Sequence, residues 1–184
     1  MFEKGVLNGK GEKHSITGST YMGDFVKGIR EGIGKEETNE HVYVGEFKGD
    51  KKNGTGRLTY KKINEIYEGE FFDNCITGKG CYTWPNGDQY NGMFLDGKMH
   101  GFGVYRWPDG GIYEGEYVSG IKEGIGVFKW SCGKIYEGPF RKGKPHGCGK
   151  LTLKGIPNNV QFEEGKMITK KKDLYKIHTS TSLT

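Results

Sequence analysis

A tyrosine recurs at an almost fixed interval along most of this chain. Successive members of the series are 22, 24, 23, 23 and 23 residues apart. The series is Tyr21, Tyr43, Tyr67, Tyr90, Tyr113 and Tyr136. A glycine follows each tyrosine after two residues, a second aromatic residue follows after two more, and a Gly-x-Gly pair closes each unit. Self-similarity at this period predicts a repeat array, in which each unit is one supersecondary element stacked on its neighbours.

The unit that begins at Tyr90 has the pattern of a β-hairpin. Residues 90–94 and residues 101–107 both alternate between two kinds of side chain, which is typical of strands. Turn-forming residues separate the two segments, and a Pro-Asp-Gly turn precedes the next unit. Successive units therefore predict one antiparallel β-meander.

Alternation along the strands predicts two unlike faces of this meander. One face carries the periodic tyrosines, the Gly-x-Gly pairs and further rings, and a ring over a neighbouring glycine would cover bare backbone. The other face carries glutamates on first strands and lysine or arginine on second strands, as a solvent-facing surface does. Nothing in the sequence supplies a second layer. We therefore expect an all-β, elongated, single-layer sheet that twists and curls into an aromatic-floored groove.

The pattern Tyr-x-Gly-x-Phe-x-x-Gly-x-x-His-Gly-x-Gly is clearest at residues 90–103 and 136–149. It resembles the MORN repeat (membrane occupation and recognition nexus), and the resemblance extends over residues 2–165. It implies an array of β-hairpins that serves as an interaction scaffold. Proteins with such repeats occur at membrane contacts, in ciliary radial spokes and in the cytoskeleton, sometimes beside a catalytic domain that this sequence does not show.

Some positions depart from the pattern. Asp50 and Asn74 stand where other units have glycine, and Glu36 and Thr38 stand where later units have rings. We therefore expect the N-terminal third to be less well packed than the rest.

The repeats divide the chain into four segments. These are a partial N-terminal repeat at 1–20, six full repeats at 21–159, a truncated repeat at 160–165, and a basic C-terminal tail or cap at 166–184. The last segment has five lysines and one aspartate, so it carries +4 of the chain's net +5 and leaves +1 for the rest. A nucleic-acid binder should carry a basic stripe along its body. We therefore expect no nucleic-acid partner.

The sequence also predicts the cellular compartment of the protein. No apolar run approaches the roughly 18 residues of a spanning helix, and the first residues lack the apolar stretch of a secretion signal. The four cysteines show no C-x-x-C spacing. We therefore expect a cytoplasmic protein with reduced thiols.

Six rings on the second strands are the candidate partner-binding groove. They are Tyr82, Trp84, Tyr105, Trp107, Phe128 and Trp130. They would hold the sheet together as core, and in a single layer they would also remain open to a partner. An exposed apolar strip of this length is typical of an interaction surface. We expect a partner's helix or strand to bind there, or another chain to pair end to end with an open strand edge.

The candidate lipid-binding residues are Lys170, Lys171 and Lys172. A charge run of this kind is usually solvated. Each lysine near an anionic membrane contributes about 1 kcal/mol of attraction, which makes four net charges a marginal anchor. Alternatively, the tail would cover the end of the last hairpin through its apolar residues.

Residue types that suggest catalysis have simpler explanations here. His100 and His146 occupy a slot before glycine that other units fill with Glu, Asn or Thr, which predicts turn capping and not a ligand role. The Gly-x-Gly pairs open strands, whereas a phosphate loop needs a following helix. No Ser/His/Asp or paired-carboxylate pattern stands out. We therefore expect no enzyme activity, no cofactor, no metal site and no small-molecule substrate.

Two functions fit these features. The first is a non-catalytic scaffold that binds partner proteins within a cytoskeletal or ciliary (axonemal, radial-spoke-like) assembly, a setting that rests on the family resemblance. The alternative is a membrane-contact adaptor that binds acidic phospholipids through the tail and basic loops. Salt would weaken lipid binding and leave ring-mediated binding intact.

Overall fold

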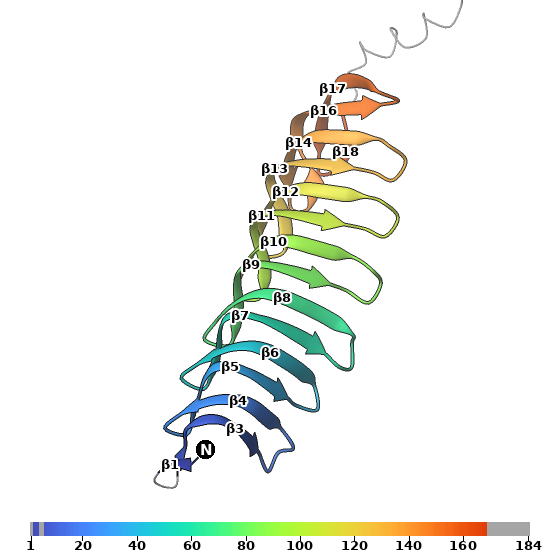
Figure 1. The fold of residues 1–184 in the computed structure, drawn as a ribbon. Coiled ribbons are helices and arrows are strands. Elements are labelled where there is room, and N and C mark those ends of the chain that lie inside the picture. Colours follow the sequence, from blue (N-terminus) through green and yellow to red (C-terminus); the bar gives the residue numbers. More distant parts are fainter. Residues whose placement is uncertain (1, 4–5, 169–184) are drawn as a thin grey trace, which may run out of the picture.

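The computed structural model describes residues 2–3 and 6–168. Figure 1 shows an elongated body in which β-hairpins stack one on another from the N-terminal to the C-terminal end. Every described element is a strand, and no helix in this part of the chain could cross a membrane.

Most strands are seven to ten residues long. Their bounds are β1 Phe2–Glu3, β2 Val6–Leu7, β3 Gly9–His14, β4 Thr20–Val26, β5 Ile29–Glu37, β6 His41–Lys48, β7 Lys51–Tyr60, β8 Glu65–Phe72, β9 Cys75–Thr83, β10 Gln89–Leu95, β11 Lys98–Arg106, β12 Ile112–Val118, β13 Ile121–Lys129, β14 Ile135–Arg141, β15 Lys144–Pro145, β16 Gly147–Leu153, β17 Ile156–Glu163 and β18 Lys166–Met167.

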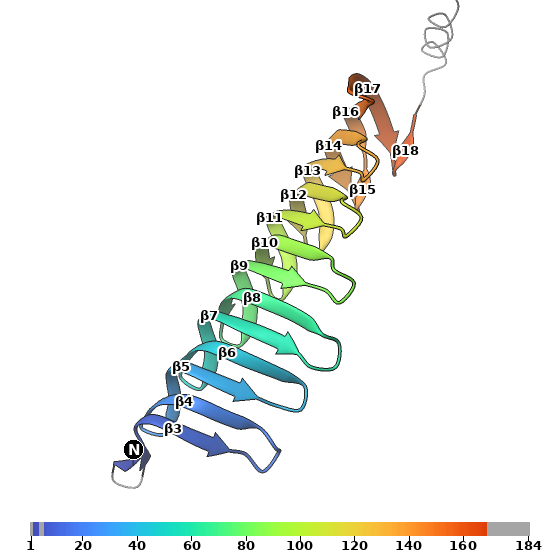
Figure 2. The same ribbon diagram turned by 45° about the vertical axis from the view of Figure 1, so that its right-hand side comes forward.

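Neighbours in sequence are neighbours in the sheet. Strands β3 to β18 form one 16-stranded antiparallel sheet, in which β14 pairs with both β15 and β16, while β1 and β2 form a separate two-stranded sheet. The rotated view in Figure 2 shows the same order of hairpins along the body. The predicted single-layer antiparallel meander is confirmed.

The repeat tyrosine explains the glycines that accompany it. In the second unit, Gly45 of β6 lies opposite Gly56 of β7, and the Tyr43 ring covers both. A methyl group on Gly45 would lie 2.5 Å from the Cα of Gly56, and one on Gly56 would lie 2.5 Å from Cε2 of Tyr43. The Tyr43 hydroxyl donates to the carbonyl of Glu46 at 2.9 Å. The predicted packing of rings on neighbouring glycines is confirmed, and these glycines leave no room for a side chain.

The core is a line of rings, because a single layer has no interior of its own. Each repeat tyrosine contacts the ring of its own unit and the ring of the next. Tyr21, for example, lies 5.1 Å from Phe25 and 4.9 Å from Phe47 between centroids, nearly perpendicular to both. We call this zigzag the Tyr–Phe column. Its members are Phe25, Tyr21, Phe47, Tyr43, Phe71, Tyr67, Phe94, Tyr90, Tyr117, Tyr113, Phe140, Tyr136 and Phe162.

In four units, the residue in the slot before the Gly-x-Gly pair connects consecutive hairpins. Its side chain accepts a hydrogen bond from a backbone N–H in the turn of the following hairpin. The bonds are Asn8 from Lys27 at 2.9 Å, Glu31 from Gly49 at 2.9 Å, Glu123 from Lys142 at 2.9 Å and His146 from Glu164 at 3.5 Å. The predicted turn-capping role of this slot is confirmed for His146.

The two turn positions without glycine keep the conformation that glycine favours. Asp50 has φ of 65° and Asn74 has φ of 71°. Asn and Asp tolerate this left-handed region better than other side chains do. Both departures therefore preserve the turn.

Candidate functional site

The six predicted groove residues form a continuous row of rings, which we call the aromatic ladder. They lie on β9, β11 and β13 or directly after them. Neighbouring centroids are 4.5 to 5.3 Å apart. The order is Tyr82, Trp84, Tyr105, Trp107, Phe128 and Trp130. The ladder arises because residues two apart on a strand share a face, and each unit repeats the pair.

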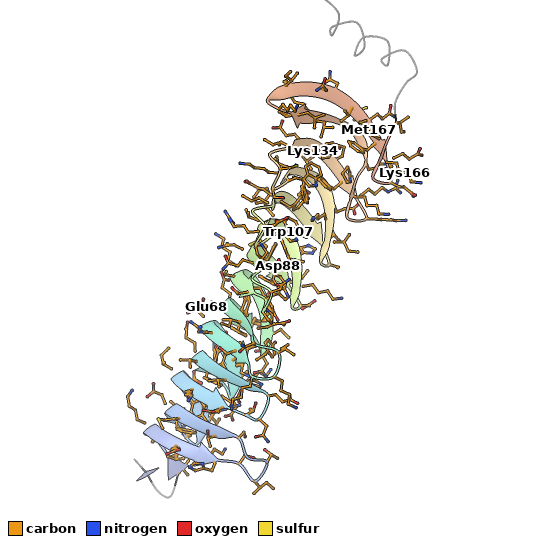
Figure 3. All side chains as sticks on the ribbon, turned by 90° about the vertical axis from the view of Figure 1, so that its right-hand side faces the viewer. Glu68, Asp88, Trp107, Lys134, Lys166 and Met167 are labelled. Atoms are coloured by element: carbon orange, nitrogen blue, oxygen red, sulfur yellow. The ribbon has the colours of Figure 1, made fainter. Side chains whose placement is uncertain are left out.

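One side of the ladder packs against the Tyr–Phe column, and all six rings are half-buried. Trp107 lies within the side-chain layer in Figure 3, whereas Glu68 projects from the other face of the sheet. Glu68 pairs with Arg57 across the strands at 3.0 Å, one of the opposite-charge pairs expected on that face. The ladder is therefore core on one side and surface on the other.

Carboxylates hold the polar ends of the ladder tyrosines. The Tyr105 hydroxyl donates to Oδ2 of Asp88 at 2.7 Å, and the Tyr82 hydroxyl donates to Glu65. Burial, with a further contribution from these carboxylates, raises the pKa of both tyrosines. Both hydroxyls therefore remain protonated at neutral pH and fix the tilt of their rings.

A pocket of about 330 Å³ opens beside the ladder. It is lined by Met99, Tyr105, Trp107, Tyr117, Gly120, Ile121, Lys122 and Gly143. The Lys122 ammonium lies 4.5 Å from the ring centroid of Trp107 and 4.7 Å from that of Phe128. Burial lowers the pKa of Lys122 to about 8. The pocket thus combines an apolar wall with a cation that is poorly solvated.

The N-terminal repeats hold charges on the same face. Glu36 contacts Arg30 and Lys52 at 2.6 Å each and His41 at 3.3 Å, and we call these four residues the ionic cluster. Partial burial alone would raise the pKa of Glu36, but hydrogen bonds from Lys52, Arg30 and His41 and the charge of Lys52 lower it to about 2. We expected looser packing here; Glu36, with its ion pairs, takes the place that a ring takes in several later repeats.

A family model of the MORN repeat matches the chain six times. The matches are residues 21–38, 43–62, 67–89, 90–112, 113–133 and 136–154, which together exceed half of the chain. This chain belongs to the MORN-repeat family. Membership of this family supports the interpretation of this MORN protein as a repeat scaffold. All six matches lie within residues 21–159, the segment predicted to hold six full repeats.

Two solved structures of peptide-binding domains share a distant likeness with this MORN protein. One is the SAS-4 (dCPAP) TCP domain of Drosophila melanogaster with a proline-rich motif of Ana2 (dSTIL), at 16% identity, 82% coverage of this chain, 88% of that chain and a TM-score of 0.42. The other is the TCP10 domain of Danio rerio CPAP with a STIL peptide, at 12% identity, 83% coverage of each chain and a TM-score of 0.23. At these TM-scores, neither likeness bears on the function of this chain.

The sequence interpretation missed the ionic cluster and the pocket cation of this MORN protein. The sequence did contain a signal for both. Arg30, Lys52 and Lys122 occupy equivalent positions in their repeats, each nine residues after a repeat tyrosine. The predicted lipid-binding residues Lys170, Lys171 and Lys172 lie outside the described residues.

The described residues of the candidate site are rings and one cation. Within residues 2–3 and 6–168, no three His, Cys, Asp or Glu side chains are grouped so that they could hold a metal ion. The ladder instead offers flat ring faces to apolar side chains, and the pocket offers a cation beside them.

Proposed function

We propose that this MORN protein is a non-catalytic scaffold that binds a helix or a strand of a partner protein along the aromatic ladder. The observation that carries the proposal is the unbroken row of six rings, packed on one side only. Aromatic side chains are enriched where interfaces are strongest, because they bury much area for little loss of side-chain entropy.

We further propose that the scaffold works in the cytoplasm, within a cytoskeletal or ciliary assembly. Family membership supports this setting by analogy. The ends of the sheet support a structural role. Within the described residues, β3 pairs in the sheet with β4 alone, and at the other end the short β18 pairs with two residues of β17. Unpaired edges favour pairing with another chain.

A pull-down from native extract tests ladder binding. The intact chain is compared with Trp84→Ser/Trp107→Ser and with Arg57→Ala, whose side chain is exposed and ion-paired on the opposite face. We expect partners that bind the intact chain and Arg57→Ala at low and at high salt and are lost with the double variant. Matching circular dichroism spectra establish that all three proteins are folded. Partners retained by the double variant would refute binding along the ladder.

Binding to an anionic membrane is the second candidate, and one observation favours it. Arg141, Lys142 and Lys144 gather with His146 and Glu164 around a pocket of about 210 Å³. Co-sedimentation with phosphatidylserine vesicles tests this candidate. Binding that falls with added salt and with Lys142→Ala/Lys144→Ala supports it. Absence of binding at low salt excludes it.

A further inference from the structure

One residue that lines the pocket beside the ladder, Tyr117, has a buried hydroxyl group without a partner among the described residues. Tyr117 is 2% exposed, and its hydroxyl has no hydrogen-bond acceptor within the described part of the chain. Every other full repeat has phenylalanine at this position. A buried hydroxyl that makes no hydrogen bond destabilises the fold. The Tyr117 hydroxyl is therefore a donor that lacks its acceptor.

A second donor lies directly across the strand pair. Lys122 on β13 is the register partner of Tyr117 on β12, and both line the pocket. Its ammonium lies 4.5 to 4.8 Å from the centroids of three rings, and no carboxylate of the described residues forms an ion pair with it. Rings attract a cation, but they offer it no hydrogen-bond acceptor of carboxylate strength.

The same chain shows what a cation in this slot binds elsewhere. Lys52 occupies the equivalent position and contacts Glu36 of the preceding repeat at 2.6 Å. For Lys122, the position equivalent to Glu36 is Tyr105, which lines the pocket and lacks a carboxylate. In the N-terminal half the chain supplies the acid itself. In the C-terminal half the place beside the cation is a pocket.

We propose that the pocket between Tyr117 and Lys122 receives an aspartate or glutamate side chain of the partner segment that lies along the aromatic ladder. This inference rests on the proposed scaffold function and adds the chemistry of the residue that the scaffold selects. Tyr117 would donate to one carboxylate oxygen and Lys122 to the other. Trp107, Met99 and Ile121 would exclude water around the pair.

The composition of the pocket favours a carboxylate over a phosphate group. A phosphate dianion carries about two charges and three acceptor oxygens. The pocket lining offers a single cationic side chain, Lys122, beside apolar walls. One cation and one hydroxyl match the charge and the two oxygens of one carboxylate.

Selection from a random peptide display library tests the inference. The full chain serves as bait in its wild-type form and as Lys122→Met, Tyr117→Phe and the control Lys129→Met. Lys129 is an exposed lysine at the other end of β13. Met is the native residue of the Lys122 slot in the preceding repeat, at Met99, and Phe is the native residue of the Tyr117 slot in other repeats, so both variants should fold.

We expect wild-type and Lys129→Met baits to enrich peptides with an acid at one fixed position beside apolar residues. Replacing that acid by its amide should weaken binding to the wild type about tenfold, as for a hydrogen bond to a charged group, and binding to Lys122→Met less than about twofold. Tyr117→Phe should weaken the same peptides severalfold and raise the melting temperature. A purely structural role of the tyrosine would not produce this combination.

The outcomes separate the two proposals. Enriched peptides without a fixed acid, or an amide effect equal in wild type and Lys122→Met, overturn the inference and leave ladder binding intact. The variant Trp84→Ser/Trp130→Ser changes the ladder outside the pocket. Peptides that bind this variant as well as they bind the wild type, or a selection that enriches nothing, overturn both proposals.

Discussion

The N-terminal and C-terminal halves of the sheet use one backbone to present two kinds of surface. In the N-terminal half, Glu36 pairs with both Arg30 and Lys52, and Asp50 also pairs with Arg30. In the C-terminal half, rings occupy the position of Glu36, and Lys122 faces them without an acid among the described residues. The Tyr–Phe column runs through both halves, and its one change among the full repeats is Tyr117 in place of phenylalanine. The comparison teaches that the column and its glycines specify the fold, whereas the neighbouring row can change from charged groups to rings without altering it.

The largest loss of stability should come from truncating a tyrosine of the Tyr–Phe column, and the loss should be equal in both halves. Tyr43 and Tyr113 are both fully buried. Tyr43→Ala and Tyr113→Ala should each lower the free energy of unfolding by about 3–5 kcal/mol, the usual cost of truncating a buried ring. Urea unfolding followed by circular dichroism measures this loss. If one variant were nearly as stable as the wild type, the two halves would not share a common core.

Removing the lysine that stands nine residues after a repeat tyrosine should affect the stability of the two halves differently. Lys52→Met leaves Glu36 with one fewer partner in a half-buried site, so we expect a loss of about 2–3 kcal/mol. Lys122→Met removes a cation that makes no ion pair with the described residues, so we expect no loss of stability at pH 7. The two variants are compared by thermal and urea unfolding. Equal losses would contradict the contrast between a satisfied and an unsatisfied cation.

Acid should weaken the N-terminal half through Glu36. Its pKa is held at about 2 in the folded chain against an ordinary value of 4.5. A lowered pKa contributes stability that is complete above pH 4.5 and disappears as the pH falls toward 2. The contribution should be roughly 1–3 kcal/mol at pH 7. Wild type and Glu36→Gln are unfolded in urea from pH 7 to pH 2.5, and we expect their difference to shrink in acid. A difference independent of pH would rule out the ion pairs as its source.

The smallest loss of stability should come from removing a hydrogen bond that connects two hairpins. This loss should also be equal in both halves. Glu31 accepts from the Gly49 N–H and Glu123 from the Lys142 N–H, both at 2.9 Å. Glu31→Ala and Glu123→Ala should each cost about 0.5–1.5 kcal/mol, the net value of one hydrogen bond. Amide hydrogen exchange should quicken at Gly49 in the first variant and at Lys142 in the second. Unchanged exchange at these two amides would show that the links do not hold the turns.

The sequence predicted the repeating part of the structure well, because that part depends on local spacing. The interval from Tyr43 to Gly45 and on to Gly56 identifies which ring covers which glycines, and the hairpins followed from it. The six ladder rings also came from strand parity. The ionic cluster did not, because it joins residues from three segments whose side chains meet only after the sheet forms. The lack of a partner for the Tyr117 hydroxyl depends on three-dimensional surroundings that no spacing reveals.

The strands lie across the long axis of the body, so the hydrogen bonds between them run along that axis (Figure 1). A pull on the two ends therefore loads one strand contact at a time, instead of many contacts side by side. Terminal hairpins would detach first, and each released unit of about 23 residues would extend to at most roughly 76–83 Å. Under force the array would therefore lengthen hairpin by hairpin and not in a single step.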